Sequence, residues 1–311
     1  MAINEKGIKH FLNKRYVQPL YYYLTVLRES PHKRAVYDFE AHNLMLEKIN
    51  MHYKNYLNNK LNVIDLGCGK HYPHTLLFSM DGHQVTGIDM AYIIKSPSIK
   101  SYIKSLKLNG FLETARYLQL DLMKKREQYF NFIESFKKEK ISDHLNMEFI
   151  RDDAERIEKI EDSSVDLVIS KDVFEHLRNP DNAIKRTFEI LKVGGLCLHI
   201  IHLYASISGG HNPHWDNFSK YEPWDHLRKE KVTLPFAYLN RLTASDYIRS
   251  FKKYFTTTCF EYHSFTHLRT QKSIEGILTQ DIYNEILVRH PNLNKRDLLN
   301  EKLIVLAKRD H

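Results

Sequence analysis

The hydrophobic and polar positions of the chain change their spacing several times. Over residues 41–57 the apolar side chains recur at helical intervals, which predicts an amphipathic helix. Residues 62–66 (NVIDL) then have the pattern of a short buried strand, residues 75–80 that of the start of a helix, and residues 84–88 (QVTGI) that of a second strand, which ends at Asp89. The pattern therefore predicts a strand, a helix and a second strand in succession.

Residues 96–140 interrupt this alternation with helical patterning that opens at Ser96-Pro97. After this insertion the strands and helices alternate again. The further strands are expected at 147–150, 165–170, 196–203 after the Gly194-Gly195 stop, 256–262 and 302–307, and the further helices at 180–191, 243–254 and 273–288.

Strands separated by helices predict an α/β fold with a doubly wound, mostly parallel sheet, here of seven strands, covered by helices on both faces. We expect an N-terminal helical cap over residues 1–60 and a larger domain over 61–311 that carries the helical insertion at about 96–146. Ligands of such sheets bind at the carboxyl ends of the strands.

The composition is that of a globular protein, because 42% of the 311 residues are hydrophobic. The longest apolar stretch, residues 196–205, is too short to cross a bilayer, and the N-terminus lacks the apolar core of a signal peptide. We expect a cytoplasmic protein without a membrane partner. The three cysteines are far apart in sequence, which favours neither a disulfide framework nor a zinc knuckle.

The formal charge of +8 is concentrated in the insertion, where residues 95–140 hold eleven basic and five acidic side chains. Such a run is either a solvated helical surface or a positive lid that attracts an anionic acceptor. No nucleic-acid recognition module accompanies the charge, so we do not expect a nucleic-acid partner.

Two glycines, Gly67 and Gly69, follow the strand at 62–66, and Asp89 ends the next strand. Glycine lets the backbone approach a ligand, and an acid at this spacing can hold ribose hydroxyls. A dinucleotide site needs a third glycine where this chain has Tyr72, and Asp65 would repel a pyrophosphate. A ligand with a ribose and a cationic amine fits better, and S-adenosylmethionine is such a ligand.

Three segments of the chain together resemble class I S-adenosylmethionine-dependent methyltransferases, in particular the group that includes the ubiquinone-biosynthesis methyltransferases. They are VIDLGCGKHYPHTLLFSMDGHQVTGIDM (63–90), FIRDDA (149–154) and SSVDLVISKDVFEHLRNPDNAIKRTFEILKVGGLCL (163–198). The resemblance covers about 62–203 and implies a Rossmann-like fold. Lys70 and His71 depart from the family pattern, since many relatives carry another glycine there.

The resemblance implies cofactor-binding roles for residues at the ends of four strands. Around the methionine part of the cofactor it places Asp65, Gly67, Cys68 and Gly69; at the ribose and adenine it places Asp89, Met90, Asp153 and Ala154; and beside the methyl donor it places Ser170 and Lys171. Alternative roles remain open for two of them, because Asp65 also suits a strand-end cap and Asp153 a helix N-cap.

Methyl transfer to a hydroxyl usually requires a base, and histidine is the commonest one. The candidates are His176 after the fourth strand, His202 late in the fifth strand, and His211, which shares the loop SGGHNPHW with His214. Structural roles are the alternative for His176 and His202. For His211 the alternatives are a lid or a part in acceptor binding.

We expect no bound metal, although one rival hypothesis makes these histidines ligands. Asp172, Glu175 and His176 resemble the acidic and histidine run of some metal-assisted O-methyltransferases, and His211 or His214 would complete the set. The aromatic loop over 223–227, with Trp215, Tyr221 and Tyr238, offers rings that stack on a sugar or simply cover the sheet edge.

The sequence thus predicts a methyltransferase that uses S-adenosylmethionine. We expect O-methylation of a small polar acceptor, a carbohydrate or a sugar-containing anionic precursor. An RNA or protein methyltransferase and a non-catalytic S-adenosylmethionine-binding protein are the alternatives.

Overall fold

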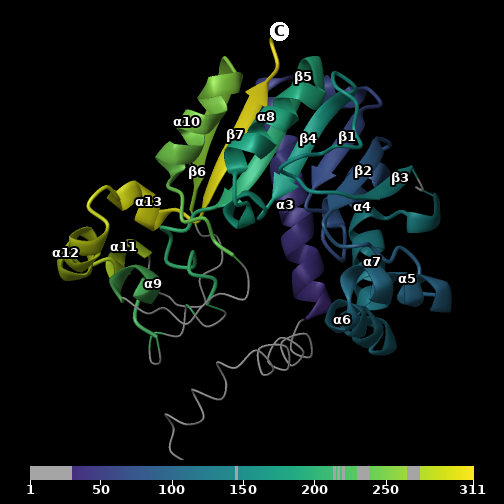
Figure 1. Ribbon diagram of the computed structural model, residues 1–311, viewed down its shortest axis with the longest axis horizontal. Coiled ribbons are helices and arrows are strands. Elements are labelled where there is room, and N and C mark those ends of the chain that lie inside the picture. Colours follow the sequence, from purple (N-terminus) through teal and green to yellow (C-terminus); the bar gives the residue numbers. More distant parts are fainter. Residues whose placement is uncertain are drawn as a thin grey trace, which may run out of the picture. The chain divides into compact units, whose positions relative to one another are not determined.

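The computed structural model describes residues 30–143, 146–212, 215, 218, 221–229, 238–264 and 274–311 (Figure 1). Within these residues seven strands form one sheet in the order β3-β2-β1-β4-β5-β7-β6. The pairs β2–β3, β1–β4 and β4–β5 are parallel, and β7 is antiparallel to both β5 and β6. The predicted mostly parallel α/β sheet is confirmed.

The chain divides into two compact units, each built from two segments. The first unit comprises Met1–Lys60 and Cys68–Arg151, and the second comprises Leu61–Gly67 and Asp152–His311. The described residues 30–60 therefore group with the segment that contains the helical insertion.

The first unit begins, in its described part, with the long helix α3. It runs over Pro31–His52, because Ser30 caps its amino end and Pro31 suits the first helical turn. The remaining elements of this unit are η1 (Tyr56–Asn58), α4 (Pro73–Met80), β2 (Gln84–Asp89), α5 (Ile99–Asn109), α6 (Phe111–Leu122), α7 (Lys125–Lys137), η2 (Ile141–Asp143) and β3 (Met147–Arg151).

The predicted helix at 41–57 is thus placed too late, since the capping residue lies upstream of the apolar pattern. The expected insertion consists of the three helices α5, α6 and α7. Its α7 joins the core of the first unit, where Tyr129 and Ile133 are fully buried against a cluster that includes Ala35, Leu76 and Met147.

The second unit begins with β1 (Asn62–Leu66), the strand that precedes the two glycines. Its other elements are β4 (Val165–Lys171), η3 (Phe174–His176), α8 (Pro180–Ile190), β5 (Leu191–His202), α9 (Asp225–Arg228), α10 (Ala244–Tyr254), β6 (Thr257–His263), α11 (Ile274–Ile277), α12 (Gln280–Arg289), α13 (Lys295–Leu299) and β7 (Lys302–Lys308). Helices α8 and α10 lie side by side (Figure 1), where Asp181 accepts hydrogen bonds from Lys253 and Tyr254.

The structure differs from two predictions for the second unit, the start of β5 and the helix at 273–288. Strand β5 starts at Leu191 and runs through Gly194-Gly195, because Gly194 adopts a φ of +86° and a register shift near Val165 absorbs the irregularity. The helix expected at 273–288 is two helices, since Thr279 caps α12 and separates it from α11. Throughout the described ranges we find no helix of sufficient length and apolarity to span a membrane.

Candidate active site

In the first unit, Asp89 at the end of β2 holds the turn that contains Gly69. The backbone N–H of Gly69 donates to Asp89 Oδ2 at 3.0 Å, and that of Ala91 donates to Oδ1 at 2.8 Å. Burial raises the pKa of Asp89, while these two backbone donors oppose the shift. The next residue, Met90, leaves 71% of its surface exposed. The carboxylate is therefore fixed in place at a strand end, beside an uncovered apolar side chain.

The insertion covers the residues that depart from the family's glycine pattern. Lys70 forms an ion pair with Glu113 of α6 and lies 5.8 Å from the ring centroid of Tyr117. His71 packs against Tyr129 of α7 with 4.8 Å between ring centroids. Tyr72 takes a left-handed conformation with φ of +36°. The turn thus continues without a third glycine, because Tyr72 adopts the positive φ and insertion side chains pack on Lys70 and His71.

In the second unit, the turn after β1 approaches the segment after β4. Gly67 has a φ of +68°, and a Cβ at this position would lie 2.4 Å from Cγ2 of Val173. Asp65, one of the predicted cofactor-binding residues, lies on β1 and is only 2% exposed. The glycine is required here both for its conformation and for the close approach of Val173.

Ser170 and Lys171 end β4, and their side chains take different partners. Ser170 is buried, and its hydroxyl lies 2.8 Å from Nδ1 of His199. The ammonium group of Lys171 lies 3.0 Å from the carboxylate of Asp172. The Ser170 side chain therefore contributes to the core of the second unit, and the Lys171 side chain belongs to a charged group described below.

Asp153 caps a turn rather than the helix for which the sequence left a capping role open, because residues 154–156 form a turn. Its Oδ1 accepts the backbone N–H of Glu155 at 2.9 Å, and its carbonyl accepts those of Arg156 and Ile157. Ala154, the next residue, is buried, with 8% of its surface exposed. Capping engages one carboxylate oxygen of Asp153 and places the turn directly after the acid.

The three candidate catalytic histidines come together in the second unit. The rings of His202 and His211 stack with 4.8 Å between their centroids, and His176 meets His211 edge-on at 5.0 Å. Nδ1 of His176 lies 2.8 Å from the carbonyl oxygen of Tyr238. Because a carbonyl only accepts, Nδ1 carries the hydrogen, and Nε2 of the neutral ring keeps a lone pair.

Two glycines explain how His211 reaches His202. Successive turns fold residues 203–211 back on themselves, with Gly209 N donating to Ser206 O and His211 N to Ser208 O, both at 2.9 Å. A Cβ on Gly209 would lie 2.2 Å from the carbonyl oxygen of Tyr204, and one on Gly210 would lie 2.6 Å from the ring of His226. Only glycine fits this path. His214, from the same sequence motif, lies outside the described residues.

Charged side chains surround the histidines. Asp172 pairs with Lys171 and, at 2.6 Å, with Lys302 of β7. These two ammonium groups hold the pKa of Asp172 well below its usual range. Glu175 is only 2% exposed, and burial, followed by the charge of Asp172, raises its pKa. Burial also lowers the pKa of His202, and that of His211 to about 4.

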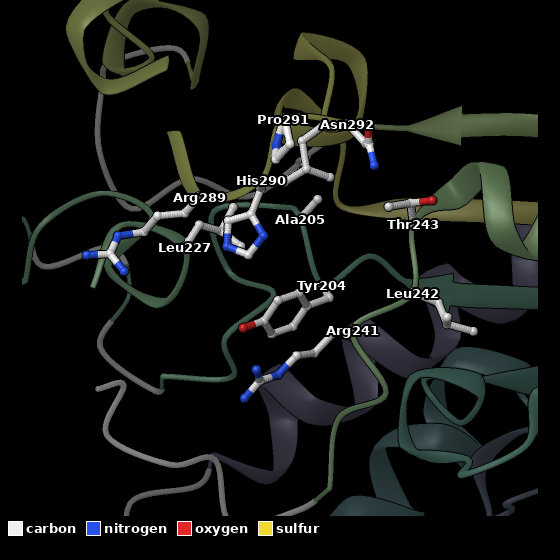
Figure 2. A pocket seen from close by; sticks show the side chains of 11 residues that line it. Tyr204, Ala205, Leu227, Arg241, Leu242, Thr243, Arg289, His290, Pro291 and Asn292 are labelled. Carbon is white, nitrogen blue, oxygen red and sulfur yellow. The ribbon is translucent and has the colours of Figure 1, made fainter. Parts of the chain in front are cut away.

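The second unit also contains a pocket of about 270 Å³, and some of its lining residues are close in sequence to the histidines (Figure 2). Tyr204 and Ala205 line it, and they follow the His202 end of β5 after one intervening residue. The other lining residues are Leu227, Arg241, Leu242, Thr243, Arg289, His290, Pro291, Asn292 and Leu293. None of the described residues that line the pocket is acidic, so the pocket is basic and otherwise largely apolar.

Asn240 ties this pocket to the histidine cluster. Its side-chain amide donates to the carbonyl oxygens of Phe174 and Leu177 at 2.7 and 3.1 Å, and its backbone N–H donates to that of Glu175 at 2.9 Å. The neighbouring Arg241 lies 5.7 Å from the ring centroid of Tyr204 (Figure 2). The turn that carries Glu175 and His176 is thus joined to a wall of the pocket.

The aromatic loop serves packing as well. Trp224 and Leu227 are buried in a core cluster, and Trp215 packs against it. Tyr238 is 51% exposed, with the guanidinium of Arg178 5.6 Å from its ring centroid. Sequence reasoning missed Lys302, Tyr204, Arg241 and His290, because each comes from a separate element. No sequence motif marks them.

A model of the methyltransferase-domain family matches residues 37–256, which is more than half of the chain. The chain belongs to this family. It is a class I methyltransferase that depends on S-adenosylmethionine, as the sequence resemblance predicted.

Several solved structures resemble the methyltransferase. The PH0226 protein from Pyrococcus horikoshii OT3 is 15% identical, with 87% of this chain and 91% of that chain covered and a TM-score of 0.44. A Haloferax volcanii chain from a complex with the Trm112 methyltransferase activator is 14% identical, with 87% and 93% covered and a TM-score of 0.42.

A third structure is phosphoethanolamine N-methyltransferase 2 of Haemonchus contortus, in complex with S-adenosylmethionine. It is 15% identical, with 85% of this chain and 53% of that chain covered and a TM-score of 0.43. Among curated proteins, none matches the methyltransferase.

Proposed function

We propose that this methyltransferase methylates an oxygen atom of a small, polar, anionic acceptor, such as a sugar-containing acid or phosphate. The observation that carries the proposal is the basic pocket in the second unit. Its volume of about 270 Å³ suits a small metabolite. The guanidinium groups of Arg241 and Arg289 have no carboxylate partner in the described part of the chain, so they can bind an anionic group.

For the cofactor we propose the residues that the family resemblance implies. In the first unit these are Cys68, Gly69, Asp89 and Met90; in the second they are Asp65, Gly67, Asp153, Ala154, Ser170 and Lys171. The fit is supported by the positive φ of Gly67 and by the fixed carboxylate of Asp89, which retains lone pairs for ribose hydroxyls. S-adenosylmethionine supplies an electrophilic methyl group on a sulfonium, and its leaving group needs no acid.

For the acceptor hydroxyl we propose the cluster of His176, His202 and His211. The lone pair on Nε2 of His176 can accept the hydrogen of a hydroxyl, since the Nδ1–H of that ring donates to Tyr238. Asn240 joins this turn to the pocket wall, so that one acceptor molecule can place its anionic group near Arg241 and its hydroxyl near the imidazoles. Positioning supplies much of the rate of such a transfer.

The test is to incubate the protein with methyl-labelled S-adenosylmethionine and with cell extract separated by anion exchange. We expect label in a small anionic compound, and at least about tenfold less label with Arg241→Met, because a charge-assisted pair is lost. Arg249→Met is the matched control, since Arg249 is exposed and pairs with Asp246 on α10. Label in RNA or protein, or equal labelling by Arg241→Met, would overturn the anionic small-molecule acceptor.

A further inference from the structure

The side chains of Glu175, His202 and His211 converge on one point of the second unit. One ligand atom from each of them lies within 4.8 Å of the others. Ligand atoms around a tetrahedral Zn²⁺ at bond lengths near 2.1 Å are separated by about 3.4 Å. Small rotations of the three side chains would therefore bring all of them onto a single ion.

The Glu175 carboxylate is a second, independent indication of a ligand. It is 2% exposed, and within the described ranges of the chain neither of its oxygens makes a hydrogen bond of good geometry. Only weak donation reaches it from backbone N–H groups, those of Glu175 itself and of His202. A buried carboxylate so weakly satisfied is unfavourable unless something neutralises and coordinates it. Nε2 of His176 lies 4.0 Å from Oε1 of Glu175, which is too far for a hydrogen bond.

The side chains around the three residues help to position them. Lys171 and Lys302 form ion pairs with Asp172, and Lys302 also lies 3.8 Å from Glu301, so both lysines pair with carboxylates other than Glu175. The Ser208 hydroxyl lies 2.8 Å from Nε2 of His202 and fixes the orientation of its ring, as outer partners of metal-binding histidines do. Gly209 and Gly210 confine the loop that carries His211.

We propose that Glu175, His202 and His211 bind one divalent transition-metal ion of the Zn²⁺, Fe²⁺ or Mn²⁺ class. Two imidazoles and one carboxylate favour such ions over Mg²⁺ and Ca²⁺, which prefer oxygen ligands. This set differs from the Asp172, Glu175 and His176 run that the sequence indicated, because Asp172 is committed to lysines. Three protein ligands leave coordination positions open, which is the arrangement of a catalytic rather than a structural site.

The proposed role of this ion, unlike its binding, rests on the proposed function. With the acceptor hydroxyl on an open position, the ion would lower the pKa of that hydroxyl and orient it. His202 and His211 would then act as ligands, and His176 would remain the only imidazole of the cluster that faces the hydroxyl directly.

The test measures metal binding alone, without cofactor or acceptor. Chelator-treated full-length protein is titrated with Zn²⁺ by calorimetry and with Co²⁺ by visible absorption. We expect one ion per chain, with an intense Co²⁺ spectrum, and affinities at least about tenfold weaker for Glu175→Gln and His211→Gln. His52→Gln is the control, because His52 is exposed at the end of α3 in the first unit, and we expect it to bind as the wild type does.

Absence of stoichiometric binding, or unchanged affinity in both Glu175→Gln and His211→Gln, would overturn the metal site. His211→Gln keeps the test decisive if Glu175→Gln fails to fold, since His211 lies on a loop. Calorimetry with S-adenosylmethionine, done separately, distinguishes the two proposals. Methyl transfer that persists with chelator would reject a catalytic ion and leave the methyltransferase function intact.

Discussion

The backbone N–H of Gly69 donates a 3.0 Å hydrogen bond to the carboxylate of Asp89, twenty residues later in the chain. The predicted ribose-binding acid therefore also holds the glycine turn in place. A substitution of Asp89 should for this reason affect both the cofactor and the turn.

We expect Asp89→Ala to raise the Kd for S-adenosylmethionine about 10- to 100-fold, because charge-assisted hydrogen bonds to the ribose are lost. Isothermal titration calorimetry measures this change. Asp162→Ala is the control, since Asp162 is an exposed partner of Arg186 in the second unit. Equal affinities of Asp89→Ala and the wild type would contradict the ribose assignment.

Gly67 offers a test that separates backbone strain from steric conflict. Gly67→Ala should lower the free energy of unfolding by more than Gly82→Ala does. Both glycines have positive φ, a conformation that costs an L-residue about 1–2 kcal/mol. Of the two new Cβ atoms, however, only the one at position 67 would collide with a neighbour, the side chain of Val173. Urea denaturation measures both variants. The double variant Gly67→Ala/Val173→Ala should recover part of the difference, and no recovery would show that the collision is not the cause.

Asn240 should be important because it joins the pocket wall to the turn of Glu175 and His176. Asn240→Ala removes two side-chain donors to carbonyl oxygens and leaves those oxygens without these partners. We expect a loss of about 1–3 kcal/mol in the free energy of unfolding. We also expect less methyl transfer from labelled cofactor. Asn300→Ala, which removes a bond to the carbonyl of Arg296, should cost less because that bond is exposed. Equal costs would argue against the anchoring role.

Acid should destabilise the protein through His199. Burial lowers its pKa to about 3, whereas an unfolded histidine titrates near 6.5. As the pH falls from 6.5 toward 3, the unfolded chain binds a proton that the folded chain does not. His199 therefore contributes a loss of up to about 1.4 kcal/mol per pH unit. The free energy of unfolding of His199→Gln, measured by urea denaturation between pH 7 and pH 4.5, should fall less steeply than that of the wild type. Parallel pH profiles would contradict this account.

The strands could be predicted because their signal is local. Residues 62–66 and 165–170 are short segments rich in Val, Ile and Leu, and both are strands of the second unit with bounds within one residue of those expected. The start of α3 and the course of β5 could not be predicted so well. Helix α3 begins at Pro31 because Ser30 caps it, although the apolar pattern starts later. Strand β5 includes two glycines because it pairs with β4 and β7.

The candidate site likewise has a part that the sequence predicts and a part that it does not. The glycines and acids at strand ends form a pattern in sequence, so a family resemblance could point to them. The grouping of His176, His202 and His211 needed the turns at Gly209 and Gly210, and the ion pair of Asp172 with Lys302 joins residues 130 positions apart. Long-range packing of this kind leaves no periodic signal in one sequence.

The position of β7 bears on how the chain folds during synthesis. This strand lies between β5 and β6, so neither can complete its hydrogen bonds before Lys302–Lys308 has left the ribosome. Until then β5, which carries His202, has one unpaired edge. Nascent chains should therefore require protection by chaperones during the interval in which β5 has been made but β7 has not.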